Sequence, residues 1–175
     1  HRQGRRGAGT DRKEREAMMS VGTKRKAELK YTTSWGIESI LRAAIPNPLL
    51  VIAPSVHADG VYAMATHHWY VKMGFPAYKR WSMLQGFWKW FKRHDCDDKA
   101  NIFKVFMQGC FRNAKIADCD GFAVFRIFYH IGGERTKGHA INLVITDHGV
   151  EFVEPQTARF VTLTQAELES IWTVY

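Results

Sequence analysis

Three residues in the C-terminal half have the types and the chain order that nucleophilic catalysis by a thiol requires. Cys96 lies among three aspartates, His139 follows a glycine at the start of an apolar run, and Glu154 precedes Pro-Gln at the end of the next apolar run. A cysteine in the first turn of a helix favours the thiolate, because unpaired backbone N–H groups there stabilise negative charge. An imidazole would take the thiol proton, and a carboxylate would hold that imidazole in one tautomer. The pattern predicts a Cys-His-Glu triad that forms a thioester.

The spacing of these residues agrees with a placement on neighbouring elements. His139 lies 43 residues after Cys96 and 15 residues before Glu154. The shorter separation suits a β-hairpin, in which the start of one strand lies beside the end of its partner. We therefore expect Glu154 to reach the far nitrogen of His139. The oxyanion of an acyl intermediate would meet the backbone N–H of Cys96 and one side-chain donor, for which Gln85 is the candidate, with Trp90 behind it.

Each of these residue types also has a purely structural interpretation. A cysteine is often a small buried hydrophobe, His139 would then be a structural histidine, and Glu154 a solvated strand end. Cys110 and Cys119 are assigned to core or loop. The remaining histidines are typical of surface or packing positions, with the adjacent pair His67-His68 a candidate for metal binding: His57, His67, His68, His94, His130 and His148. Five acids are candidate calcium ligands or helix caps: Asp95, Asp97, Asp98, Asp118 and Asp120.

The elements that must position the triad begin after an N-terminal arm. Residues 1–16 are rich in glycine and arginine and lack apolar periodicity, which is typical of an extended or disordered segment. An amphipathic helix is predicted over 34–44, ending before two prolines, and a buried strand over 49–53. Residues 57–78 show no clear period and are predicted as loop with a possible short helix. The aromatic residues of 79–92 indicate a largely buried helix or turn.

The second half predicts the helix of the thiol and the sheet of the other two residues. Asp95 is a good N-cap for a helix that ends near Gly109. The following elements are predicted as strands over 122–130, 139–146 and 150–154, with a tight hairpin between the last two, then a short helix or turn over 165–171 and an extended 172–175. The fold class is α+β, with N-terminal helices and a nucleophile helix packed on a C-terminal antiparallel sheet. This is the layout of papain-like and transglutaminase-like folds.

Length and charge divide the chain into an arm and one domain. At 175 residues the chain has the size of a single domain, and we expect a basic flexible arm over 1–30 and one papain-like domain over 31–175. Residues 1–30 hold ten Lys/Arg against four acids, which is six of the eight net positive charges. Such an arm attracts nucleic acid, an anionic surface or an acidic subunit, or serves as a solvated tail.

Composition also bears on the compartment. No run approaches the roughly 20 apolar residues that span a bilayer, so a soluble protein without a membrane span is expected. The three cysteines form no Cys-x-x-Cys pair and have no zinc-ligand spacing. Free thiols in a reducing interior, such as the cytoplasm, are the simpler interpretation.

Three segments carry a resemblance to a known family. Segments 95–100 (Asp-Cys-Asp-Asp-Lys-Ala), 138–142 (Gly-His-Ala-Ile-Asn) and 152–157 (Phe-Val-Glu-Pro-Gln-Thr) resemble a papain-like, transglutaminase-like group of cysteine peptidases. This group includes the C-terminal domain of the Marasmius oreades agglutinin and related bacterial and phage-encoded proteins, often described as lectin-like. The resemblance covers about residues 80–175 and depends mainly on the Glu-Pro-Gln element after a His-Ala strand.

The resemblance implies a Cys-His-Glu triad at Cys96, His139 and Glu154, and it matches Gln156 to the glutamine of the Glu-Pro-Gln motif. It also implies calcium, with no ligands that map onto this sequence, whereas the sequence itself requires no cofactor. Lys99 departs from the aromatic or small residue of many relatives. The carbohydrate-binding repeats of the agglutinin are absent, so the resemblance does not carry sugar binding over.

The leading hypothesis is a papain-like cysteine hydrolase, most simply a peptidase that acts on a protein or peptide; a transamidase or deamidase would use the same thioester. The alternative is a non-catalytic structural or assembly protein, plausibly of a phage particle, whose arm 1–30 binds a neighbouring virion subunit or nucleic acid. A lectin-like binding module is a third hypothesis.

Overall fold

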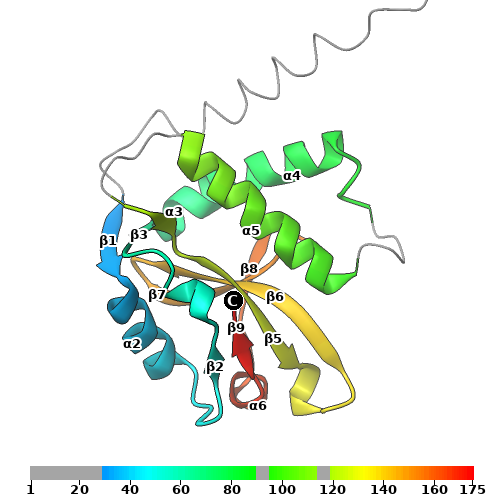
Figure 1. The fold of residues 1–175 in the computed structure, drawn as a ribbon. Coiled ribbons are helices and arrows are strands. Elements are labelled where there is room, and N and C mark those ends of the chain that lie inside the picture. Colours follow the sequence, from blue (N-terminus) through cyan, green and yellow to red (C-terminus); the bar gives the residue numbers. More distant parts are fainter. Residues whose placement is uncertain (1–28, 90–94, 114–118) are drawn as a thin grey trace, which may run out of the picture.

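The computed structural model describes residues 29–89, 95–113 and 119–175, and the predicted arm 1–30 therefore lies almost entirely outside the described residues. The helices are α2 (Ser34–Ala44), α3 (His67–Trp69), α4 (Phe75–Leu84), α5 (Cys96–Asn113) and α6 (Gln165–Glu169), with a π-helical turn (Tyr70–Gly74) joining α3 to α4. The strands are β1 (Lys30–Thr33), β2 (Val51–Ile52), β3 (Val61–Met64), β4 (Gly121–Phe122), β5 (Val124–His130), β6 (Gly138–Thr146), β7 (Gly149–Glu154), β8 (Arg159–Val161) and β9 (Thr173–Val174). Along the described chain, α3, α4 and α5 follow one another, and most strands of the sheets come after them (Figure 1).

Six strands form the main sheet in the order β2-β9-β5-β6-β7-β8. The neighbours β5, β6 and β7 pair antiparallel, as the sequence predicts. The short strand β8, which was not predicted, pairs antiparallel with β7, whereas β2 joins β9 in parallel. The β6–β7 hairpin pairs Thr146 with Gly149, so Asp147 and His148 form a two-residue turn. Gly149 has a φ of 94°, a conformation that glycine adopts without steric cost. This hairpin sets the register of the predicted site.

A second sheet of three strands, β1-β3-β4, lies beside the main sheet and was not predicted. β1 pairs antiparallel with β3, and β3 pairs in parallel with β4. The interpretation of 57–78 as mainly loop is wrong, because this segment contains β3, the π-helical turn and the first part of α4, whereas the short helix it allowed for is present as α3. Its buried residues include aromatics such as Tyr62 and Tyr70 and the alanines Ala63 and Ala65, and they obey neither a strand nor a helix period throughout.

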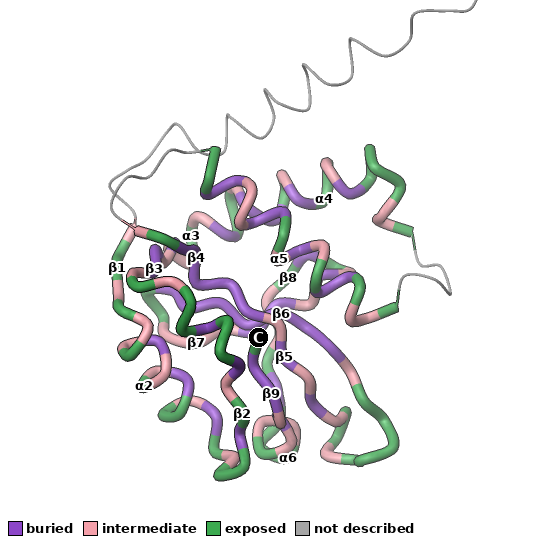
Figure 2. Tube along the Cα trace, viewed as in Figure 1, coloured by how far each residue is buried: buried purple, intermediate pink, exposed green. Residues whose placement is uncertain are grey.

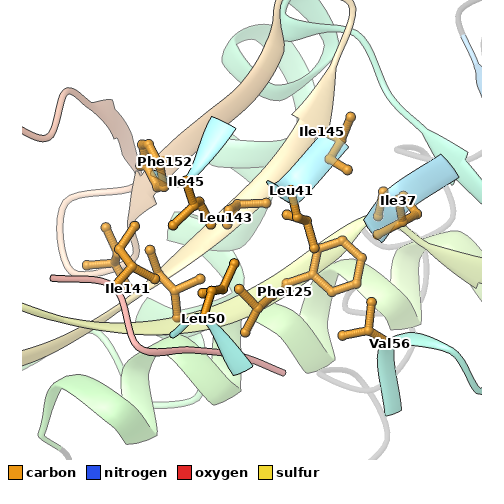
Figure 3. Close-up of a cluster of buried hydrophobic side chains, with 14 of the residues drawn as sticks. Ile37, Leu41, Ile45, Leu50, Val56, Phe125, Ile141, Leu143, Ile145 and Phe152 are labelled. Carbon is orange, nitrogen blue, oxygen red and sulfur yellow. The ribbon is translucent and has the colours of Figure 1, made fainter. Parts of the chain in front are cut away.

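The main sheet buries both of its faces. Alternate residues of β6 point to opposite sides, so that Leu143 and Val144 belong to different hydrophobic clusters. One cluster lies under α2 (Figure 3) and includes Ile37, Leu41, Ile45, Leu50, Val56, Phe125, Ile141, Leu143, Ile145 and Phe152. The other lies under α4 and α5 and includes Phe75, Tyr78, Phe103, Phe106, Met107, Val144 and Val153. Figure 2 shows the middle of the sheet buried and the loop that joins β5 to β6 exposed.

Helix α2 has the predicted bounds. The Thr33 side chain accepts the backbone N–H of Gly36 at 3.1 Å and caps the helix, while Ile37 and Leu41 supply its buried stripe. The buried strand predicted over 49–53 is shorter than expected. Only Val51–Ile52 pair, and Val51 is exposed because β2 is an edge strand.

Helix α5 packs against β5 and β6, which agrees with a helix covering the C-terminal sheet. It begins at Cys96 as predicted but continues to Asn113, one turn beyond the predicted end near Gly109. Burial of Cys110 and Phe111 in the cluster under α4 and α5 stabilises this last turn. Within the described residues, no helix combines the length and the apolar character needed to cross a membrane.

Candidate functional site

The β6–β7 hairpin brings His139 and Glu154 into contact. His139 is the second residue of β6 and Glu154 the last residue of β7, and their Nε2 and Oε2 atoms lie 2.9 Å apart. The two side chains are 16% and 18% exposed, so solvent screens their interaction only in part. A carboxylate at Nε2 favours the tautomer that carries its proton on Nε2. The other ring nitrogen, Nδ1, can then accept a hydrogen bond from another group.

The second oxygen of Glu154 is also engaged. Oε1 accepts the backbone N–H of Gln156 at 3.0 Å, within the turn that follows β7. Gln156, matched to the family motif, thus supports Glu154 through its backbone. A carboxylate bonded at both oxygens has a fixed orientation, and it fixes the ring of His139 in turn.

Cys96 is the first residue of α5 and is half-buried. Asp95 stands before it: a side-chain hydrogen bond with Asp97, together with the backbone N–H groups of Asp97 and Asp98, lowers the pKa of Asp95, and the same side-chain bond raises the pKa of Asp97. These bonds serve the start of the helix, as the capping interpretation predicts. In the described part of the chain, no hydrogen bond joins the thiol of Cys96 to His139.

Tyr129 shows that the thiol and the His139–Glu154 pair share one neighbourhood. It is the cross-strand partner of His139, with ring centroids 5.7 Å apart in an edge-on arrangement. Burial raises the pKa of Tyr129 to about 12, and the nearby charges of Glu167, Glu154 and Cys96 act in the same direction. His139 therefore contacts this phenol, and Glu154 and Cys96 lie close enough to influence its pKa, while the catalytic roles assigned to the three residues stay predictions.

Lys99 is an unexpected buried cation one turn after Cys96. Its ammonium group donates to the backbone carbonyl of Phe87, and to that of Lys89 at 3.1 Å, in the segment that follows α4. Burial lowers the pKa of Lys99. Lys99, the residue that departs from the family pattern, thus connects residues 87–89, just after α4, to the first turn of α5.

The remaining predicted residues lie elsewhere. Gln85 ends α4 and is exposed, and within the described residues its side chain makes no hydrogen bond to the predicted triad, so its predicted oxyanion role has no support in the geometry. Trp90 lies outside the described residues, as do His94 and Asp118. Asp120, a candidate calcium ligand, accepts the backbone N–H groups of Gly60 and Val61, each at 3.1 Å. The implied calcium stays a prediction.

A second group of residues near His139 was not predicted from the sequence. We call it the arginine–aromatic face: Arg126, Phe128, His130, Trp172 and Tyr175. The first three are alternate residues of β5 and are half-buried. The last two come directly before and after β9, which pairs with β5. The i, i+2 spacing of Arg126, Phe128 and His130 was a usable signal, because such residues share one side of a strand. Its partners, 42 or more positions further on, had no signal.

The contacts within this face are close. The Arg126 guanidinium carbon lies 5.0 Å from the Phe128 ring centroid and 5.1 Å from that of Tyr175. Trp172 contacts Phe128 and His130 with centroid distances of 5.9 Å and 4.4 Å. Trp172 also approaches Gly138, the residue before His139, where a Cβ would lie 3.9 Å from its ring. Trp172 thus lies beside the start of β6, whereas the strand alternation places Arg126, Phe128 and His130 on the other side of the sheet from the His139 side chain.

Comparison with known proteins gives a likeness of fold. No family model and no curated protein matches the chain. Solved structures of a lectin from Polyporus squamosus are similar: a complex of PSL1a with E64, and the lectin bound to the human-type influenza-binding epitope Neu5Acα2-6Galβ1-4GlcNAc. Each has a TM-score of 0.60 and 19% identity, over 82% of this chain and 49% of the other. The chain thus spans about half the length of these lectin structures.

The comparison supports only the coarser part of the family resemblance. The lectin is a relative of the Marasmius oreades agglutinin type, which the sequence resemblance includes, whereas membership of a peptidase family is unsupported. The α+β class agrees with the structure, and a lectin-like fold is matched without confirmation of the papain-like details.

The predicted function is wrong by this comparison. The similar structures are of a glycan-binding lectin, which contradicts a papain-like cysteine hydrolase acting on a protein or peptide. It also contradicts the alternative, a phage assembly protein that binds virion subunits or nucleic acid through residues 1–30. The physical reason is that chain order and element type brought three residues together without specifying the thiol–imidazole bond on which that chemistry depends.

Proposed function

We propose that this chain binds an acidic carbohydrate at the arginine–aromatic face. The observation that carries the proposal is a set of buried polar atoms beside aromatic rings. Arg126 Nε and His130 Nδ1 are buried and have no hydrogen-bond partner in the described part of the chain. Asn142, directly across from Arg126 in the β5–β6 ladder, is fully buried and donates to the backbone carbonyls of Ala100 and Phe125, so it lies behind the face and fixes it to α5. A buried polar group without a partner costs about 1–3 kcal/mol, and a ligand that supplies both donors and acceptors removes this cost.

The aromatic side chains suit the other surface of a sugar. A pyranose presents apolar C–H groups on its faces and hydroxyl groups at its edges. Phe128, Trp172 and Tyr175 supply flat apolar area with polar tips on two of the three rings. Binding sites for small polar ligands combine such aromatic walls with a few oriented polar groups. The arginine–aromatic face has both components.

The charge of the face favours an acidic sugar. Lys104 on α5 lies near Arg126: burial lowers the pKa of Lys104, the positive charge of Arg126 lowers it further, and the negative charge of Asp59 raises it by a smaller amount. Within the described residues neither cation has an ion-pair partner closer than 4 Å. A carboxylate between two cations gains charge-assisted hydrogen bonds, and an arginine pairs with it through two parallel bonds. The sialylated epitope bound by the similar lectin carries such a carboxylate, which supports the choice of ligand.

The test is calorimetric titration of the full chain with Neu5Acα2-6Galβ1-4GlcNAc and with the same glycan lacking Neu5Ac. We expect the sialylated glycan to bind more tightly. Arg126→Gln removes the charge-assisted bonds and should weaken this binding at least tenfold, or about 1.4 kcal/mol. Trp172→Ala should weaken both glycans, because both lose the stacking surface.

Trp35→Ala is the matched control. Trp35 is 75% exposed on α2, which covers the opposite face of the main sheet from α5, and its removal should leave glycan binding unchanged. The proposal fails if neither glycan binds at millimolar concentration. It also fails if Trp35→Ala weakens binding as much as Trp172→Ala, because the glycan would then lie elsewhere.

A further inference from the structure

Two histidines and a glutamate from separate segments meet at the end of the β6–β7 hairpin. His67 begins α3, His148 lies in the hairpin turn, and Glu151 lies on β7. One ring nitrogen of each histidine and one carboxylate oxygen of Glu151 all lie within 4.8 Å of one another. These residues belong neither to the His139–Glu154 pair nor to the arginine–aromatic face.

Hydrogen bonds hold this group in place. Glu151 Oε1 lies 2.7 Å from His67 Nδ1, and Oε2 accepts the hydroxyl of Thr146 at 2.6 Å. The backbone N–H of His148 donates to Thr146 Oγ1 at 3.0 Å. The carboxylate of Asp147 accepts the backbone N–H of His67 at 2.7 Å and fastens the start of α3 to the hairpin turn. These hydrogen bonds thus orient the three candidate side chains before a metal ion binds.

Ring stacking and exposure complete the site. The ring of His67 stacks with that of His148, with centroids 4.6 Å apart, and with that of Phe160, with centroids 4.5 Å apart. His67 and Glu151 are half-buried, whereas His148 is exposed. One open side gives an ion a route in, and Phe160 shields the other side of the His67 ring.

We propose that His67, His148 and Glu151 bind one divalent transition-metal ion of the zinc type. Two imidazoles with one carboxylate are donors that zinc, copper and nickel accept, whereas calcium and magnesium take oxygen ligands alone. Three protein ligands leave a coordination position for water or another ligand. The ion would join α3 to a hairpin more than 80 positions later in the chain. Because the unfolded chain lacks this arrangement, metal binding stabilises the fold by mass action.

The experiment is a titration of the metal-free full chain with Zn²⁺. Calorimetry measures the binding, and the melting temperature measures the stabilisation. We expect one Zn²⁺ per chain with a raised melting temperature, and no displacement by excess Ca²⁺. Co²⁺ in place of Zn²⁺ should give visible absorption bands of a site with nitrogen ligands. Loss of a residue that only hydrogen-bonds a metal ligand lowers metal affinity by about 10–100-fold. His148→Ala removes a ligand itself, so it should lower the affinity for Zn²⁺ by at least about 100-fold.

His68→Ala is the matched control, because His68 is the exposed neighbour of His67 and lies outside the group. It should retain the affinity of the parent chain. If His148→Ala fails to fold, Glu151→Gln gives the same test, since the amide oxygen still accepts from Thr146 but the ligand charge is lost. The proposal is overturned if the parent binds no Zn²⁺, or if His68→Ala weakens binding as much as His148→Ala or Glu151→Gln.

Discussion

Strand β7 carries two glutamates that each contact a histidine, Glu151 in its middle and Glu154 at its end, and the two pairs differ in their surroundings. Glu151 meets His67 through Nδ1 at 2.7 Å, and Glu154 meets His139 through Nε2 at 2.9 Å. The two carboxylates are almost equally exposed, at 17% and 18%. A contact between a histidine and a carboxylate therefore does not identify the chemistry of a site.

The neighbours of each pair make the difference. His67 has a second histidine and a phenylalanine stacked on it, and within the described residues its Nε2 has no hydrogen bond, which suits a metal ligand set. His139 lies edge-on to Tyr129, in the neighbourhood of the thiol-bearing end of α5, and its Nδ1 has no hydrogen bond to the part of the chain that the structure describes. The free nitrogen and what it faces are the properties that experiments on the two pairs must separate.

The largest expected effect concerns thiol reactivity. Cys110 is buried, and burial raises its pKa to about 12, whereas Cys96 is half-buried at a helix start. Iodoacetamide at pH 7.5 should therefore modify Cys96 at least about 100-fold faster than Cys110. Peptide mass spectrometry measures the two rates. If His139 assists the thiol, His139→Ala slows the modification of Cys96, and His67→Ala does not. Equal effects of the two substitutions would remove the distinction between the pairs.

The next effect is on stability and separates the two glutamates. Glu151→Ala leaves the buried hydroxyl of Thr146 and the ring of His67 without their acceptor, and it breaks bonds of 2.6 Å and 2.7 Å. Glu154→Ala breaks bonds of 2.9 Å and 3.0 Å. Shorter charge-assisted bonds are stronger, so urea unfolding should show a loss of about 2–3 kcal/mol for Glu151→Ala and about 1–2 kcal/mol for Glu154→Ala. Glutamine at either position keeps an acceptor oxygen and should lose less. The reverse order of the two alanine variants would contradict the comparison.

The two pairs also differ in how far the sequence predicts them. Glu154 and His139 follow from hairpin geometry, because two adjacent strands with a two-residue turn fix which residues face each other. His67 and Glu151 are 84 positions apart, and the segment of His67 has no regular period. Only tertiary packing places α3 against the hairpin turn, and the same holds for Trp172 beside β5.

Local signals account for the elements that were predicted well. Helix α2 has an amphipathic stripe, a threonine cap and a following proline, so that propensity, pattern and stop signal agree. The second sheet had no such agreement, since β1 lies in a charged stretch and β4 is two residues long. Lys99 was recognised as a departure from the family pattern, but its carbonyl partners precede it in a segment whose conformation no periodicity specifies.

The smallest expected effect comes from Lys99, a buried cation one turn after Cys96. Burial lowers the pKa of Lys99 in the folded chain, whereas the unfolded value is about 10.4. Between these two values the unfolded chain binds more protons, so the contribution of Lys99 to the free energy of unfolding rises with pH. Below this window the buried charge opposes folding while its two hydrogen bonds favour it, so Lys99→Met should change stability by at most about 1 kcal/mol at neutral pH.

Urea unfolding at a series of pH values up to 10 measures this contribution as the difference between the parent chain and Lys99→Met. The parent should gain stability relative to the variant as pH rises, because other titrating groups, such as the buried tyrosines, cancel in the difference. Lys89→Met is the control: Lys89 is exposed and contributes only its backbone carbonyl to Lys99. Its curve should run parallel to that of the parent. A Lys99→Met curve that also runs parallel would mean that Lys99 keeps its ordinary pKa, and that its hydrogen bonds to Phe87 and Lys89 form without desolvation of the charge.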